Sequence, residues 1–169
     1  YNMEWTQIIA ASISAAATIL SVFLGKFLLN KRLEWKKDPI IADVENNQNI
    51  EICLGYVLAE TGADRAYIMQ FHNGGYYISG KSQQKFSCTH EVCTAGTSKE
   101  CQRSQNHLIS NYHHYVNELM VSQKYCYEDC GKIKDHSFKN VILAQGVKSI
   151  YNIPLKTLEG KVIGILGVD

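Results

Sequence analysis

The sequence predicts an α+β fold, with an N-terminal transmembrane helix followed by a domain that has a central antiparallel sheet and flanking helices. Three observations support this prediction. The chain opens with a long uncharged run, a helical periodicity follows Pro39, and the later segments follow the order strand, strand, helix, helix, strand, strand. Because 169 residues hold one anchor and one domain of ordinary size, we expect an anchor with a basic flank at residues 1–38 and one globular domain at residues 39–169.

The first segment has the length and the flanks of a single membrane span. No charged residue lies between Trp5 and Gly25, and at about 1.5 Å per residue this run crosses the roughly 30 Å hydrocarbon core of a bilayer. Basic residues crowd its C-terminal side, so the positive-inside rule predicts that the domain is cytoplasmic. A cleaved signal peptide would carry its positive charges before the run. Because polar side chains interrupt the run, a buried core helix, or an amphipathic helix packed in an assembly, is the alternative.

Small residues recur at every fourth position of this run and form two stripes along the helix. Such stripes let helix backbones approach closely in lipid, so they favour self-association of the anchor. The alternative is that alanine and serine are merely tolerated there. We predict a homo-oligomer held through one stripe of Ala10, Ser14 and Thr18 and a second stripe of Ala17, Ser21 and Gly25.

The first half of the domain is predicted to contain one helix and two strands. Apolar residues at helical spacing follow residue 40 and stop at a glycine at 62. Residues 66–71 form a short apolar strand, and Asn73-Gly74 is a strong two-residue turn signal. Residues 85–92 form the second strand. We therefore expect a hairpin that reverses at the Asn-Gly pair.

The second half is predicted to contain two helices and a closing hairpin. Residues 105–121 carry apolar side chains at helical spacing, and residues 138–145 form a shorter helix closed by Gly146. Residues 147–169 are predicted to form two strands around a Leu-Glu-Gly turn.

The closing hairpin resembles that of a GAF domain, both in Pro154-Leu155 and in the run GKVIGILGV at residues 160–168. The opening is similar as well, because a helix leads into a strand after Ala-Asp-Arg at residues 63–65. The resemblance covers about residues 43–169 and implies a GAF-like domain. The motifs DRAYIMQFHNGG and SCTHEV also resemble uncharacterised membrane-anchored GAF-like proteins of bacteriophage genomes. GAF domains usually continue into a C-terminal helix that covers one face of the sheet. We expect that this helix is lacking here, or that further residues or a partner chain cover that face instead.

The resemblance also implies a ligand pocket between the sheet and the helices and loops on one side. Ligands in the family include cyclic nucleotides, tetrapyrroles and small metabolites, and we assign no cofactor. The His-Asn pair after the first strand lies near this region, with a turn that caps local backbone groups as the alternative. On the second strand, alternation sends Cys88 and His90 to one face and Thr89 and Glu91 to the other, so only one pair can face a pocket. The candidate ligand-binding residues are His72, Asn73, His90 and Glu91.

The six cysteines are a second group of candidates, and three interpretations stay open. Cys53, on the apolar side of its helix, is predicted to be a core residue. In a reducing cytosol the others are free or buried thiols, or thiolate ligands of a tetrahedral zinc, although no Cys-x-x-Cys pair is present. In an oxidising compartment they would pair as disulfides. The metal or disulfide candidates are Cys88, Cys93, Cys101, Cys126 and Cys130.

Charge and motifs narrow the function. A formal net charge of +1 provides no bulk field for nucleic acid, so the partners we expect are the lipid bilayer, a second copy and a small molecule. No serine-hydrolase, P-loop, dinucleotide or zinc-protease motif occurs, which favours a protein that is not an enzyme. One function is a membrane-anchored sensory or regulatory module. The alternative is a phage-type assembly, virion or lysis-control protein whose GAF-like domain is a scaffold without ligand.

Overall fold

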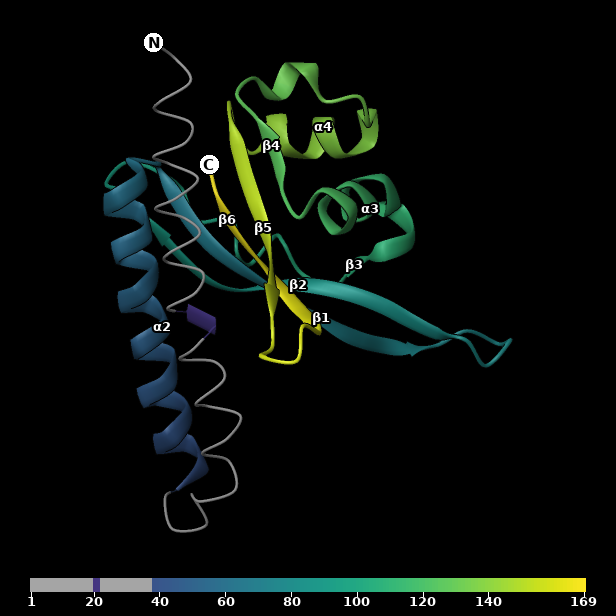
Figure 1. Cartoon of the computed structure of the whole chain (residues 1–169), viewed down its shortest axis with the longest axis horizontal. Coiled ribbons are helices and arrows are strands. Elements are labelled where there is room, and N and C mark those ends of the chain that lie inside the picture. The colour runs from purple at the N-terminus through teal and green to yellow at the C-terminus, as the bar shows by residue number, and fades with distance from the viewer. Residues whose placement is uncertain (1–19, 22–37) are drawn as a thin grey trace.

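The computed structural model describes residues 20–21 and 38–169 of the chain. One antiparallel sheet forms the centre, with one long helix on one face and two shorter helices on the other (Figure 1), which confirms the α+β domain. The helices are α2 (Pro39–Thr61), α3 (His113–Ser122) and α4 (His136–Ala144). The strands are β1 (Arg65–Tyr76), β2 (Ser82–Cys93), β3 (His107–Leu108), β4 (Tyr125–Tyr127), β5 (Ile150–Lys156) and β6 (Val162–Val168), with short 3₁₀ turns η1 (Ile109–Asn111) and η2 (Cys130–Lys132).

The strand order is β3-β2-β1-β6-β5-β4, so the first strand of the domain, β1, pairs with the last, β6, at the centre of the sheet. This close pairing explains a glycine in the last strand. A Cβ on Gly164 would collide with the backbone carbonyl of Met69 on β1. The closing hairpin β5–β6 was predicted, and it is confirmed, with its reversal between Thr157 and Lys161.

The two faces of the sheet bury separate clusters of apolar side chains. Ala66 and Ile68 of β1 face α2 and pack with its Leu54 and Val57. Met69, the next residue along β1, faces α3 and α4 instead. The strand thus shows the period of two that a sheet covered on both faces requires.

Local capping sets the bounds of the long helix. The Asp38 side chain accepts a hydrogen bond from the backbone of Ile40 at 2.9 Å, and Pro39 occupies the first helical position, where a missing N–H costs nothing. At the other end Gly62 has φ +64°, the left-handed conformation that terminates helices. The predicted helix at 40–62 is therefore confirmed. Asp135 caps α4 in the same way, through Ser137 and Phe138, and confirms the predicted helix at 138–145 within one turn.

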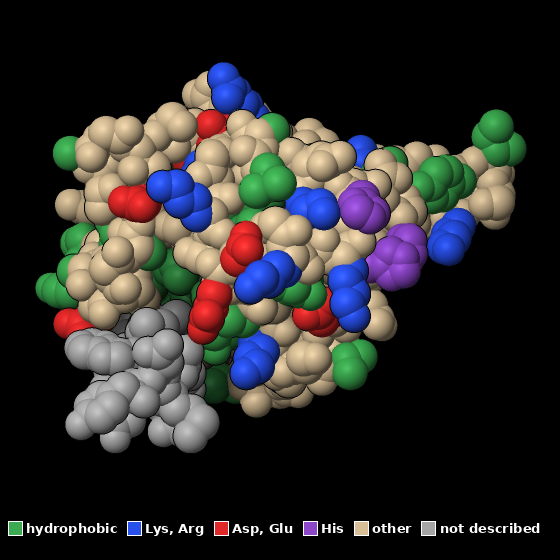
Figure 2. Space-filling view, turned by 90° about the horizontal axis from the view of Figure 1, so that it is seen from above, with side chains coloured by type: hydrophobic (Ala, Val, Ile, Leu, Met, Phe, Trp, Pro, Cys, Tyr) green, Lys and Arg blue, Asp and Glu red, His purple; other side chains and the backbone are tan. Residues whose placement is uncertain are grey.

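The predicted Asn73-Gly74 reversal is wrong. β1 continues to Tyr76, and the chain reverses between Tyr77 and Lys81, where Tyr77 N–H donates to the Lys81 carbonyl at 2.9 Å. Asn73 instead stabilises an irregularity inside the hairpin, because its Oδ1 accepts from Gly75 N–H at 3.1 Å. The longer strands make an arm that projects from the domain and ends in hydrophobic side chains (Figure 2), among them the fully exposed Ile78.

The predicted helix at 105–121 is wrong in its first half. His107 pairs with Phe86 in the short strand β3, η1 follows, and the helix begins only at His113. Asn106, at φ +57°, is in a left-handed conformation that a continuous helix excludes. Tertiary pairing with β2 thus overrides the helical periodicity. Strand β4 was not predicted, because three residues are too short to show an alternation.

The predicted membrane span lies outside the described residues except for Leu20 and Ser21. Within the parts of the chain that the structure describes, no helix is both long and apolar enough to cross a membrane. Leu20 is buried with the cluster beneath α2, and Ser21 is partly buried. The remaining residues of the two stripes, Ala10, Ser14, Ala17, Thr18 and Gly25, lie outside the described residues.

Candidate functional site

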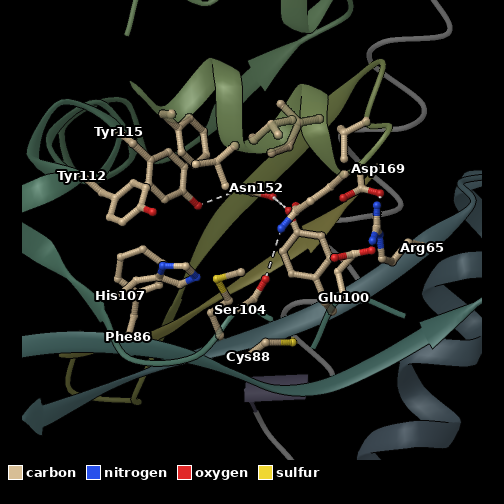
Figure 3. Close-up of a pocket in the computed structure, with 18 of the residues that line it drawn as sticks. Arg65, Phe86, Cys88, Glu100, Ser104, His107, Tyr112, Tyr115, Asn152 and Asp169 are labelled. Carbon is tan, nitrogen blue, oxygen red and sulfur yellow. Dashed lines mark hydrogen bonds and ion pairs between the residues drawn. The ribbon is translucent and has the colours of Figure 1, made fainter. Parts of the chain in front are cut away.

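A small cavity lies between the sheet and the helices α3 and α4 (Figure 3). Its volume is about 50 Å³, which is room for a few water molecules or a ligand of a few non-hydrogen atoms. Charged side chains gather at one end and aromatic rings at the other, with Asn152 between them. The lining residues that matter below are Arg65, Tyr67, Cys88, Glu91, Glu100, His107, Tyr112, Tyr115, Asn152 and Asp169.

Aromatic rings from β2, β3, α3 and α4 form the apolar end. His107 lies between Phe86, at a centroid distance of 5.2 Å, and Tyr112, at 5.1 Å and nearly perpendicular. Phe138 of α4 stacks on Tyr115 of α3 at 4.2 Å. Burial lowers the pKa of His107, so its ring is held in the neutral form. This end therefore offers flat aromatic surface and one neutral imidazole.

Asn152 forms a polar bridge across the middle of the cavity. Tyr67 Oη donates to Asn152 Oδ1 at 2.8 Å, and Asn152 Nδ2 donates to Tyr115 Oη at 2.7 Å. The amide is 1% exposed, and burial raises the pKa of both phenols, which stay neutral. Because the three residues come from β5, β1 and α3, this bridge ties the helix layer to the sheet.

The polar end contains a buried guanidinium between carboxylates. Arg65 Nε lies 2.9 Å from Asp169 Oδ1, and its Nη1 lies 3.8 Å from Glu91 Oε1. Burial raises the pKa of Asp169, and the neighbouring Arg65 opposes this shift. Glu100 lines the same end with a side chain that is 7% exposed. Arg65 thus lies beside Asp169 and Glu91, whereas Glu100 pairs at 3.3 Å with the exposed Arg103. Three carboxylates against two guanidiniums leave this end of the cavity with a net negative charge.

Glu91 was a predicted ligand residue, and it lines the cavity. Its carboxylate accepts the backbone N–H of Glu100 at 2.9 and 3.0 Å and that of Cys101 at 3.0 Å. It therefore also holds the loop at residues 94–106 against the sheet. These hydrogen bonds offset part of the cost of burying the carboxylate.

His90 lies on the opposite face of the sheet, and the predicted alternation of residues 88–91 is wrong. Ile68 pairs with His90 and Met69 with Cys88, so Thr89 is an extra residue that forms a β-bulge. The bulge returns Cys88 and Glu91 to the cavity face and sends His90 toward α2. There, His90 Nε2 lies 3.0 Å from Asn47 Oδ1, at the edge of an open groove of about 540 Å³.

His72 and Asn73, the other two predicted ligand residues, do not line the cavity. Both lie on the arm, and Asn73 accepts a hydrogen bond from Ser82 Oγ at 2.8 Å in addition to its bond with Gly75. His72 Nε2 lies 2.8 Å from Ser87 Oγ. The structure therefore separates the four predicted ligand residues into three places.

The candidate cysteines are distributed over the domain. In the described part of the chain all are free thiols, and no group of three or more His, Cys, Asp or Glu side chains is arranged for a metal ion. Cys88 lines the cavity, and the thiol of Cys101 lies beside it, 3.3 Å from the Cys88 carbonyl oxygen. Cys53, on α2, is partly buried, Cys126 is exposed and Cys130 is buried.

Sequence reasoning missed Arg65, Asn152 and Asp169. A single asparagine inside an otherwise apolar strand, at IYNIPL, was a signal that could have identified Asn152. Arg65 and Asp169 are 104 residues apart, so only the β1–β6 pairing shows that they meet.

Comparison with known proteins identifies the fold. No family model and no curated protein matches the sequence. The phycocyanobilin-bound GAF domain of a cyanobacterial phytochrome has a TM-score of 0.56 at 19% identity, covering 72% of this chain and 68% of that one. A photoproduct-state GAF domain from Synechocystis has a TM-score of 0.54 at 12% identity, covering 72% and 75%. NreA from Staphylococcus aureus, with mutations in its nitrate binding site, has a TM-score of 0.53 at 12% identity, covering 78% and 86%. The fold is GAF-like, with a curled antiparallel sheet and three described helices.

Proposed function

We propose that this chain is a sensory module that binds a small ligand in the cavity between the sheet and the α3–α4 layer. The observation that carries this proposal is the cavity itself, with its buried charges, the Asn152 bridge and an aromatic end. Structural neighbours include phytochrome GAF domains, which support a sensory role for the fold. The proposed role is regulatory and not enzymatic.

The volume restricts the ligand. Sites for drug-sized molecules measure about 300–1,000 Å³, whereas this cavity measures about 50 Å³. A bilin, such as that bound in the phytochrome neighbour, is far too large for it. The ligand that fits has only a few non-hydrogen atoms.

The charges restrict the ligand further. Three carboxylates lie against the buried Arg65 and the exposed Arg103, so the net charge at this end is negative, which disfavours an anion such as nitrate and favours a cation or a neutral hydrogen-bond donor. The aromatic rings of Phe86, Tyr112 and Phe138 add faces on which a small cation is stabilised. We infer that the ligand is a small amine or a similar compact cation.

Strand β1 offers a route from the cavity to α2. Tyr67 and Met69 line the cavity, and Ile68 between them packs beneath α2 with Leu54. A shift of β1 on ligand binding would therefore move the surface on which α2 rests. Since α2 begins at Pro39, this route would lead from the cavity to the segment that precedes the domain.

Membrane anchoring and oligomerisation belong to the same proposal, and the sequence alone supports them. The uncharged run from Trp5 to Gly25 and its basic flank favour a single span with a cytoplasmic domain. The two stripes of small residues favour self-association. Burial of Leu20 beneath α2 is the one described feature that favours a packed helix instead.

A phage-type scaffold in membrane assembly, the virion or lysis control is the alternative function. The small cavity and the close stacking of Tyr115 on Phe138 favour it, because a scaffold needs a packed domain and no ligand. A native mass equal to that of the chain without a ligand, together with a melting temperature that no small molecule changes, would support this alternative.

Thermal denaturation with matched salts tests the sensory proposal. We expect small ammonium compounds, such as methylammonium chloride, to raise the melting temperature, and sodium nitrate at equal ionic strength to leave it unchanged. Glu100→Gln should reduce the response, whereas Glu128→Gln, at an exposed position, should keep it. Stabilisation by nitrate, or an equal response in both variants, would contradict the proposed ligand class.

A further inference from the structure

The β2 strand and the loop that follows it bring two thiols together. Cys88 lies on β2 and is 4% exposed, while Cys101 belongs to the loop at residues 94–106 and is partly buried. The thiol of Cys101 lies 3.3 Å from the carbonyl oxygen of Cys88. The two side chains interact with each other, and burial together with this interaction raises the pKa of Cys88.

Hydrogen bonds hold the loop in this position. Gln105 Nε2 donates at 2.6 Å to the carbonyl oxygens of both Cys88 and Cys101. Ser104 accepts from the Cys88 N–H at 2.8 Å, and Glu91 accepts from the Cys101 N–H at 3.0 Å. Hydrogen bonds to the residues before and after Cys101, and to Cys101 itself, therefore hold this part of the loop beside Cys88.

Other thiols do not compete for this position. Cys93, the cysteine nearest to the pair in sequence, directs its sulfur to the Ser98 carbonyl at 3.9 Å. Cys126 and Cys130 lie on β4 and η2, at the opposite edge of the sheet.

We propose that Cys88 and Cys101 are a redox modification site that hydrogen peroxide converts into a reversible disulfide. The more accessible sulfur of Cys101 attacks one peroxide oxygen, the O–O bond breaks, and a water leaves to give a sulfenic acid. The sulfur of Cys88 then attacks the sulfenic sulfur, the S–O bond breaks, and the Cys88 proton leaves in a second water. The two thiols lose two electrons in total, and the peroxide gains them. A thiol reductant reverses the reaction by exchange.

The disulfide would act on both faces of the sheet. Glu100 and Ser104, on the same loop, line the cavity, and Cys101 and Lys99 line the open groove beside α2. A covalent bond from β2 to this loop would fix the position of these side chains. This site is independent of the proposed ligand, because neither step involves a bound molecule other than the peroxide.

Peptide mapping of the full-length chain tests the proposal. The chain is purified with reductant, exchanged into buffer, treated with hydrogen peroxide, alkylated and digested with trypsin. Cleavage after Lys85, Lys99 and Arg103 separates Cys101, in ECQR, from Cys88 and Cys93, in FSCTHEVCTAGTSK. We expect a disulfide-linked pair of these peptides, which lacks two hydrogens and disappears after reduction.

Variants assign the bond. The linked pair should persist in Cys93→Ser and vanish in Cys101→Ser. Cys88→Ser should abolish the linked pair as well. If this variant does not fold because Cys88 is buried, the Cys101 and Cys93 variants are sufficient to show which cysteines form the bond. The proposal is overturned if the wild-type peptides stay unlinked, with both thiols alkylated or overoxidised, or if the link depends on Cys93.

Discussion

His72 Nε2 lies 2.8 Å from the hydroxyl oxygen of Ser87, which joins β1 to β2 on the arm. The same hydroxyl accepts the backbone N–H of Asn106 at 2.7 Å, just before β3. One histidine therefore supports a contact that connects three strands of the sheet. This arrangement gives His72 a structural role, away from the cavity.

Replacement of His72 tests this role. We expect His72→Ala to lower the free energy of unfolding by about 1 kcal/mol, the usual value of one intramolecular hydrogen bond. His72→Gln, which keeps a hydrogen-bonding group, should recover part of the loss. Urea denaturation measures both. Unchanged stability combined with a lost response to small cations would place His72 in the ligand site instead.

Asn152 is expected to be the most sensitive polar position of the core. Asn152→Leu keeps the branched shape and the number of side-chain heavy atoms but leaves the hydroxyls of Tyr67 and Tyr115 without their partner, so we expect a loss of about 3 kcal/mol. The triple variant that also carries Tyr67→Phe and Tyr115→Phe should regain much of this, because no buried hydroxyl is left unpaired. If the triple variant is less stable than the single one, the bridge is not the source of the loss.

Two glycines provide a matched pair for the packing of β6. Gly164→Ala should destabilise the domain by about 2 kcal/mol, because the new methyl group meets the Met69 carbonyl and the two strands must separate. Gly55→Ala, in the middle of α2 with open space around it, should stabilise by about 0.5–1 kcal/mol. Equal effects of the two substitutions in denaturant titrations would show that β6 does not approach β1 this closely.

The neutral His107 predicts an acid-sensitive domain. Burial lowers its folded-state pKa below the ordinary 6.5, so the unfolded chain takes up the proton first. The contribution of neutral His107 to the free energy of unfolding is complete above pH 6.5, and it is lost as the pH falls from there through the folded-state pKa. His107→Phe should flatten this part of the curve of stability against pH. An unchanged slope would assign the acid sensitivity to other groups.

The membrane anchor and its stripes can be tested with the full-length chain. We expect the chain to stay with membranes during alkaline carbonate extraction, as a spanning helix does. Substitution of Ala17, Ser21 and Gly25 by Leu should change the mass of the detergent-solubilised oligomer. Extraction into the carbonate supernatant would favour the packed helix that the burial of Leu20 suggests, and an unchanged mass would remove the stripes as an interface.

The bounds of two helices and the closing hairpin could be recognised from the sequence alone, because the residues that determine them are close together in the chain. Asp38 with Pro39 and Gly62 bound α2, Asp135 begins α4, and the last two strands form a hairpin from their own turn and alternation. Such signals act between residues a few positions apart, so they can be recognised without the rest of the fold. The α+β class followed from their order.

Tertiary structure decided the site. The bulge at Thr89, which brings Cys88 and Glu91 to one face and sends His90 to the other, depends on pairing with β1 and not on the period of β2. The meeting of Arg65 with Asp169 depends on a strand pair that closes the whole domain. A cavity arises only where elements far apart in the sequence fail to fill the space between them. For that reason the sequence determined the layers of this protein, whereas the packing of those layers determined which side chains share a pocket.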